Sequence, residues 1–188
     1  MALDLRRSLR RLKPDKHLGG LRRRPDAELD FAEDVPTAGP ALLLDTCVYV
    51  DVLRKAAPPD VKRLLAERRV RHFSLVLGEL SHPFGRLDPR HPGTKATLAA
   101  LASVIEAIPA RALEEPAAAT MLEAGVLAGL LFRLRGLASG REVSALVDAA
   151  LYLHALAQGY VVLTRNVGDF DLLAQLVPAG RLVFYRAG

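Results

Sequence analysis

The sequence predicts an α/β domain with a mainly parallel sheet that is flanked by helices. From residue 41 onward, apolar runs of about four residues alternate with longer segments of helical periodicity. The first run contains no polar residue, which is typical of a strand buried on both faces of a parallel sheet. Hydrophobic residues make up 51% of the 188 residues and charged residues 25%, so most of the chain is expected to fold around a core.

The expected elements alternate along the chain. Four segments are expected to be strands: 41–44, 70–73, 160–163 and 182–185. Seven segments are expected to be helices: 46–55, 58–69, 74–80, 94–108, 116–137, 145–158 and 169–176. Proline opens two of these helices, Ser or Thr is expected to cap three of them, and a glycine ends the sixth. Residues 81–93 contain three prolines and two glycines and are expected to form a loop.

Residues 1–40 differ in composition from the rest and are expected to form a charged N-terminal extension before a domain at 41–188. The first part of the extension is strongly basic and the second part is acidic. Three leucines recur at helical spacing in the basic part, which permits a short amphipathic helix. The simplest interpretation is a solvated, partly disordered arm whose two blocks pair with each other. Contact with RNA, with a partner or with a membrane surface is the functional alternative.

The composition excludes several classes of protein. The single cysteine, Cys47, cannot form an internal disulfide and rules out a Cys-rich zinc site. Tryptophan is absent and aromatic residues are only 5%, which argues against a base-stacking platform, whereas the net charge of +5 permits a polyanionic partner. No apolar stretch reaches the roughly 20 residues that span a membrane, and no secretory signal is recognisable. We therefore expect a cytoplasmic protein without membrane contact.

Four acidic residues lie in apolar sequence that is expected to be core: Asp45, Glu79, Asp148 and Asp169. Asp45 directly follows the first strand, and Asp169 follows the strand 160–163 after a short turn. Because the carboxyl ends of parallel strands meet at one edge of a sheet, these two acids are expected to lie there. Glu79 and Asp148 are expected on helices beside the same edge. The sequence thus predicts that the four carboxylates converge.

Converging carboxylates repel one another, so such a cluster persists only if some are protonated or a cation neutralises them. Oxygen ligands with few His and no Cys select a hard divalent ion, Mg²⁺ or Mn²⁺. Such an ion can activate a water and stabilise charge on a phosphodiester. Each acid also has a structural interpretation. Asp45 and Asp169 are candidate helix caps, Glu79 a surface position, and Asp148 a first-turn residue favoured by the helix dipole.

Four pieces of sequence occur in the order of a known family: LDTCVYVDVL at 44–53, GEL at 78–80, DAALYLHA at 148–155 and LTRNVGDF at 163–170. Each piece alone is weak, and the T-x-N-x-x-D-F turn is the most specific. From about Leu42 to Tyr185 the chain resembles the PIN domain, in particular the VapC-type toxins of bacterial and archaeal toxin–antitoxin systems. The resemblance implies a PIN-like three-layer sandwich with a central, mainly parallel sheet. It also implies a Mg²⁺-dependent endoribonuclease, with Mn²⁺ as a possible substitute.

The resemblance assigns the acids by position. Asp45, Glu79 and Asp148 match the first three acids of the family site. The fourth acid stands at the place of Asn166 in some relatives and of Asp169 in others. The expected catalytic set is therefore Asp45, Glu79, Asp148 and Asp169. The expected metal set is Asp45, Asp148, Asp169 and Asn166.

Three further residues are expected to take part in substrate binding: Thr46, Thr164 and Arg165. The threonines would orient carboxylates or water, and the arginine would meet the scissile phosphate. The family also implies an RNA substrate, a homodimer and a cognate antitoxin that inserts a basic side chain into the acidic pocket. The alternative is a catalytically silent PIN-like module that binds RNA or protein, against which the complete acid set argues.

Three other polar residues near these motifs are expected to be structural. Asp51 is spaced to pair with Lys55 at i+4 on its helix. Asp171 is expected to face solvent beside Asp169. Cys47 is expected to pack at a buried helix start, and not to act as a nucleophile.

Overall fold

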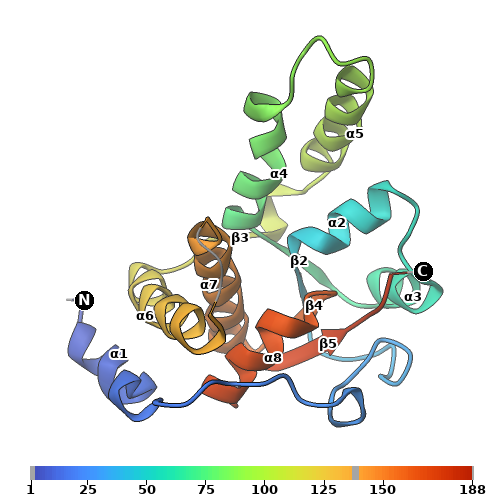
Figure 1. Cartoon of the computed structure of the whole chain (residues 1–188). Coiled ribbons are helices and arrows are strands. Elements are labelled where there is room, and N and C mark those ends of the chain that lie inside the picture. The colour runs from blue at the N-terminus through green and yellow to red at the C-terminus, as the bar shows by residue number, and fades with distance from the viewer. Residues whose placement is uncertain (1–2, 137–139, 188) are drawn as a thin grey trace.

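The computed structural model describes residues 3–136 and 140–187, which form a five-stranded parallel sheet with helices around it (Figure 1). The strands lie in the order β3-β2-β1-β4-β5, and every neighbouring pair is parallel. Their bounds are β1 Leu42–Leu44, β2 Val70–Phe73, β3 Leu113–Glu114, β4 Val161–Thr164 and β5 Arg181–Phe184. The predicted α/β class with a parallel sheet is confirmed. The two-residue β3 was not predicted, because so short a strand has no alternation to detect.

The middle of the sheet sets the position of the candidate site. β1 pairs with β2 on one side and with β4 on the other, and all three of its leucines are buried. Parallel neighbours need crossover connections, and helices supply these between the strands. The carboxyl ends of all five strands therefore meet at one edge, which is the edge where the acids were expected.

Eight α-helices occur in the described residues: α1 Leu5–Leu12, α2 Thr46–Leu53, α3 Pro59–Glu67, α4 Ser74–Arg86, α5 Thr94–Glu106, α6 Ala118–Arg135, α7 Glu142–Gln158 and α8 Val167–Leu176. Short 3₁₀ turns lie at Pro14–Lys16, Asp26–Glu28 and Ala110–Ala112. α6 and α7 pack along each other, α8 contacts both, and the pair α4–α5 extends away from the sheet (Figure 1). Within the described part of the chain, no helix is long and apolar enough to cross a membrane.

Among the helix boundaries that differ from the prediction, those of α4 and α7 bear on Glu79 and Asp148. α4 continues through Pro83, where the sequence predicted a loop at 81–93. A proline inside a helix lacks the N–H for one backbone hydrogen bond, and here the helix that contains it packs against α5. α7 begins at Glu142, three residues before the predicted start, so Asp148 lies in the second turn. The dipole at a first turn therefore does not account for this acid.

The N-terminal segment lies against the domain and contributes to its core. α1 contacts α6, and Leu12 at the end of α1 is buried. Arg11 Nη1 lies 3.0 Å from Glu123 Oε1 on α6. The basic amphipathic helix that the leucine spacing permitted is therefore present, with one face turned to the domain.

Further along, the N-terminal segment reaches the outer edge of β5. Phe31 forms a parallel bridge with Phe184, and the two rings lie 6.0 Å apart, centroid to centroid. The backbone N–H of Ala32 donates to the carbonyl of Phe184 at 2.8 Å. The N–H of Phe184 donates to the carbonyl of Asp30, also at 2.8 Å. Residues 30–32 thus pair with the last strand of the sheet.

The prediction that Asp171 faces solvent was wrong, because the N-terminal segment covers it. The side chain is fully buried on α8. Its carboxylate accepts hydrogen bonds from the backbone N–H of Arg24 at 2.8 Å and from Arg24 Nε at 2.7 Å. Gln175 Nε2 adds a third at 2.9 Å. The compensating charge comes from a residue far away in the chain, which the local pattern around Asp171 cannot reveal.

We expect Gly180→Ala to destabilise the protein. A Cβ at Gly180 would clash with the Cζ and hydroxyl oxygen of Tyr152. That ring is fully buried and its hydroxyl donates to the carbonyl of Val177, so it cannot move without opening the core. We expect a loss of about 1–3 kcal/mol in the free energy of unfolding, measured by chemical denaturation.

The matched control is Gly129→Ala on α6. Apart from its chain neighbours and the nearby backbone of α6 itself, no described atom lies within 4 Å of the Cβ that this change adds, and alanine favours a helix over glycine. We expect equal or slightly greater stability than in the wild type. An equal loss in both variants would show that the clash with Tyr152 is not the cause.

Candidate active site

Asp45 lies at the carboxyl end of β1 and at the N-cap of α2, and its side chain makes no capping hydrogen bond to that helix. Its Oδ2 atom accepts a hydrogen bond from Thr164 Oγ1 at 2.6 Å and another from the Cys47 thiol at 3.0 Å. Burial raises the pKa of the Asp45 carboxyl, while these two hydrogen bonds lower it. The side chain is therefore held at the edge of the sheet and does not serve as a helix cap.

The Cys47 thiol is a donor within this site. Burial, followed by the charge of Asp45, raises the pKa of Cys47 to about 12. The thiol is therefore protonated at neutral pH and can donate to the carboxylate, while the backbone N–H of Arg165 donates to its sulfur at 3.2 Å. A protonated thiol is a poor nucleophile, which supports the structural role expected for Cys47.

Glu79 approaches Asp45 from α4. Its Oε2 atom accepts a hydrogen bond from the hydroxyl of Thr46, the first residue of α2. Burial raises the pKa of the Glu79 carboxyl, and the nearby charge of Asp45 raises it further. A surface helix position would feel neither effect, so the structural interpretation of Glu79 does not describe its surroundings.

Asp148 completes a group of three carboxylates. It lies on α7, is only 7% exposed, and its Oδ2 atom accepts a hydrogen bond from Asn166 Nδ2 at 3.2 Å. Burial raises the pKa of Asp148 well above its ordinary value, and the charges of Asp45 and Glu79 raise it further. Charges affect one another in this way only at short range. The fold thus brings three acids together from β1, α4 and α7.

Asp169 lies beside this group but has different partners. It is 2% exposed in the first turn of α8, and Asn166 caps that helix by accepting a hydrogen bond from the Asp169 N–H at 3.3 Å. Asn166 Nδ2 also donates to Asp169 Oδ2 at 2.9 Å, so this amide links Asp169 to Asp148. The Asp169 carboxylate is in addition ion-paired with Arg135 and with Arg141 Nη2, the latter at 3.1 Å.

Arg135 and Arg141 were not predicted as site residues. The first is the last residue of α6, and the second immediately precedes α7. The chain contains many arginines, and neither of these two falls within one of the four matching motifs. Only the three-dimensional arrangement of α6, α7 and α8 places them beside Asp169.

The three residues expected to bind the substrate each pair with an acidic residue in or beside the site. Thr164 is fully buried and donates to Asp45, and Thr46 donates to Glu79, so both hydroxyls orient carboxylates. Arg165 Nε lies 3.2 Å from Asp51 Oδ2. The guanidinium of Arg165 is therefore anchored at one side of the acidic group.

The expected pairing of Asp51 with Lys55 was wrong. α2 ends at Leu53 and Lys55 has a positive φ of 57°, so the helical spacing that an i+4 pair needs is lost. Asp51 is instead buried, pairs with Arg165, and accepts a hydrogen bond from the Tyr185 hydroxyl at 2.8 Å. It anchors Arg165 from within the domain and does not face solvent.

The donors at this edge suit a hard divalent cation by their chemistry. Oxygen atoms of carboxylates predominate, as Mg²⁺ and Mn²⁺ require. Burial raises the pKa of Asp45, Glu79 and Asp148, and nearby negative charge raises those of Glu79 and Asp148 further; a cation would neutralise that charge. In the ranges 3–136 and 140–187, no group of three or more His, Cys, Asp or Glu side chains is positioned, as the side chains stand, so that it could hold a metal ion. The hydrogen bonds from Thr46, Thr164 and Asn166 hold the carboxylates in this arrangement.

Neither a family model nor a curated protein matches the chain. Among solved structures, it is similar to a chain of DNA-bound VapBC from Salmonella typhimurium, with a TM-score of 0.52 and 19% identity. That match covers 78% of this chain and 98% of the other. It is also similar to a chain of VapBC2 from Rickettsia felis bound to a promoter DNA fragment, with a TM-score of 0.46 and 16% identity. The second match covers 77% of this chain and 98% of the other.

The likeness to the Salmonella typhimurium structure defines the class of fold. The chain is an α/β protein whose parallel sheet and surrounding helices match almost the whole of a VapBC chain. It therefore has the PIN-like α/β fold that the sequence motifs predicted, and the predicted fold is confirmed.

Proposed function

We propose that the chain is a metal-dependent endoribonuclease that hydrolyses phosphodiester bonds of RNA. The observation that carries the proposal is the convergence of Asp45, Glu79 and Asp148: burial raises the pKa of each, and the charge of Asp45 raises those of Glu79 and Asp148 further. Two buried carboxylates and a half-buried one destabilise a fold that holds no metal, and a bound ligand of opposite charge would offset that cost. A divalent cation is such a ligand, and it also allows a polyanion to approach an acidic site.

In this proposal Asp45, Glu79 and Asp148 hold Mg²⁺ or Mn²⁺, and Asn166 or Asp169 supplies the fourth group. Bound there, the ion would supply positive charge and water activation for phosphodiester hydrolysis. The other site residues fix the carboxylates. The hydroxyls of two threonines donate to one acid each, and the amide of Asn166 donates to Asp148 and Asp169, which fixes the orientation of the carboxylates before the substrate binds.

We further propose that this nuclease is the toxin of a toxin–antitoxin pair, acting in the cytoplasm as a homodimer. Its fold is that of a VapBC chain. A groove of about 460 Å³ also opens beside Glu79, between α2, α4 and α5. Its walls are largely apolar and include Val50, Leu53, Leu80, Leu87 and Leu101. Such a groove suits the apolar face of a partner helix, from which a basic side chain could reach the acids.

The test is cleavage of total RNA by the purified protein. We expect cleavage with Mn²⁺ or Mg²⁺ and none with EDTA. Asp45→Asn should be inactive after the same purification. Asp60→Asn should be as active as the wild type, because Asp60 lies on the surface of α3 and pairs with Arg63 at 3.2 Å. Cleavage that persists in EDTA or in Asp45→Asn would contradict the proposal. RNA binding without any metal-dependent cleavage would favour the silent binding module.

A further inference from the structure

At the border of the acidic site, the Asp169 carboxylate is ion-paired with two arginines. Arg135 and Arg141 come from the facing ends of α6 and α7 and both pair with Asp169. The ion pairs found among the described residues use one Nη atom of each guanidinium. Arginine carries five N–H donors in a planar fork, so each side chain has donors left for a further anion.

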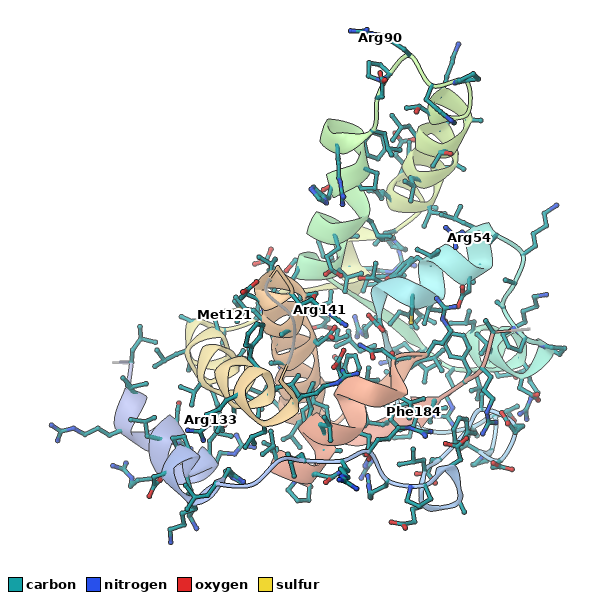
Figure 2. The ribbon with its side chains drawn as sticks, in the orientation of Figure 1. Arg54, Arg90, Met121, Arg133, Arg141 and Phe184 are labelled. Carbon is teal, nitrogen blue, oxygen red and sulfur yellow. The ribbon has the colours of Figure 1, made fainter. Side chains whose placement is uncertain are left out.

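Both guanidiniums can reach solvent and the acidic site at the same time. Their side chains are 33% and 48% exposed, whereas the Asp169 carboxylate beneath them is almost fully buried. Burial and the charge of Arg141 lower the pKa of Arg135, and the charge of Asp148 opposes this shift. The charge of Arg141 likewise opposes the raised pKa of Asp148, so both cations lie close to Asp148. In Figure 2, Arg141 lies beside α7, while Arg133 lies toward α1.

Two guanidiniums on one carboxylate also bear on what Asp169 can do. They neutralise its charge: Arg141 Nη2 donates a hydrogen bond to Oδ2, and the ion pair with Arg135 is on Oδ1, so the carboxylate has little negative charge left for a metal ion. Asp45, Glu79 and Asp148 have no such pairs with arginine at hydrogen-bond distance in the part of the chain that the structure describes. The four acids therefore divide into a group of three with unneutralised charge and one that is already paired.

We infer that Arg135 and Arg141 bind a backbone phosphate of the RNA substrate, and that Asp169 positions them and does not hold the metal. This inference rests on the proposed function, and it assigns to the fourth acid, Asp169, a positioning role. A nuclease with an acidic centre needs cationic groups beside it to hold the substrate's phosphates. Arginine forks match phosphate oxygens in a bidentate manner.

A change at Gly168 tests independently where the Arg135 guanidinium must lie. A Cβ at this position would lie 2.9 Å from Arg135 Nη2 and 3.4 Å from its Cζ. Glycine therefore lets the guanidinium lie against the first turn of α8. Gly168→Ala would push the flexible end of Arg135 aside without removing any charge, and alanine favours the helix. This variant therefore tests whether the position of the guanidinium matters while its charge is kept.

The first experiment measures RNA binding by fluorescence anisotropy at several salt concentrations. All proteins carry Asp45→Asn, so that the labelled oligonucleotide is not cleaved. We expect Arg135→Gln and Arg141→Gln each to weaken binding about tenfold, as the loss of a charged hydrogen bond does. The slope of log K against log salt should become shallower by about 0.7 for each phosphate that the variant no longer neutralises. Gly168→Ala should weaken binding in the same direction.

The matched control is Arg133→Gln. Arg133 lies on the same helix, and its Nη2 donates to the carbonyls of Pro14 at 2.6 Å and His17 at 3.1 Å. It carries the same charge as Arg135 but faces the N-terminal segment. We expect its affinity and salt slope to match those of the Asp45→Asn parent. Unchanged affinity and slope in both Arg135→Gln and Arg141→Gln would overturn the phosphate-binding role.

The second experiment measures Mn²⁺ binding by the otherwise wild-type protein, from the electron paramagnetic resonance signal of free Mn²⁺. We expect Asp169→Asn to bind Mn²⁺ with nearly wild-type affinity and Asp148→Asn to lose at least about tenfold. Equal losses in the two variants would show that Asp169 holds the metal. If the wild type cleaves no RNA but the arginine variants still bind it more weakly, the proposed function fails while the phosphate-binding role stands.

Discussion

Asp148→Asn is expected to abolish RNA cleavage and, in the absence of metal, to stabilise the fold. The amide keeps the size of the side chain but removes a buried charge that faces Asp45 and Glu79. We expect activity to fall by at least about 10²–10³-fold, as when an electrostatic group is lost from an active site. We expect the free energy of unfolding in EDTA at neutral pH to rise by about 1–2 kcal/mol, because the repulsion disappears.

The stability difference should depend on pH in a defined direction. The pKa of Asp148 in the folded protein lies well above the ordinary value of 3.8 that applies to the unfolded chain. Between these two pKa values the folded protein binds more protons than the unfolded chain, so the wild type loses stability as the pH rises through this range. Below both values the carboxyl is protonated in both states and the contribution vanishes. The advantage of Asp148→Asn should therefore grow as the pH rises above about 4.

Denaturant unfolding in EDTA at several pH values between about 4 and 8 measures this effect. Asp60→Asn is the control, because its carboxylate is at the surface and should give no comparable gain. Added Mg²⁺ should stabilise the wild type more than Asp148→Asn. An Asp148→Asn protein that is less stable than the wild type at the upper end of this range, without metal, would contradict the repulsion described for the three acids.

The second large effect is expected from Arg24→Met, which should destabilise the protein by about 3 kcal/mol. This change leaves the buried carboxylate of Asp171 without its charged partner, and breaking a buried pair costs about 3–5 kcal/mol. We take the low end because the Arg24 side chain is 39% exposed and its backbone N–H still donates to Asp171. The measurement is equilibrium unfolding, together with hydrogen exchange of residues 20–35.

Arg23→Met is the control for this prediction. Arg23 is adjacent, but it pairs with the exposed Asp26 at the surface, where ion pairs contribute little. Adding Asp171→Asn to Arg24→Met should recover part of the lost stability, because the unpaired charge is then removed. If both arginine variants lose the same stability, the buried Asp171 is not what makes Arg24 important.

Local sequence predicted the elements that end at the site. The run of three leucines before Asp45 identified β1, and the turn before Asp169 identified the end of β4. The packing of partners distant in the chain was not predictable. The burial of Asp171 depends on Arg24, and that of Asp51 on Tyr185, each more than 130 residues away. A local charge pattern favours the nearest cation, which explains the wrong pairing of Asp51 with Lys55.

The same reason applies within the site. The prediction that Asp45, Glu79 and Asp148 converge followed from placing them at or beside the edge where the parallel strands end. The division between these three acids and Asp169 did not, because it depends on Arg135 and Arg141 at the ends of two packed helices. Sequence spacing places residues on elements, whereas the partner of a charged group is decided by how those elements pack.

The pairing of residues 30–32 with Phe184 also bears on how the protein avoids edge-to-edge aggregation. An uncovered border strand exposes unpaired N–H and C=O groups, onto which a second chain can add and start an aggregate. Here the β5 border is partly occupied by the chain's own N-terminal segment, and the opposite border is the two-residue β3. The charged N-terminal segment thus covers part of the edge of the sheet onto which a second chain could otherwise add.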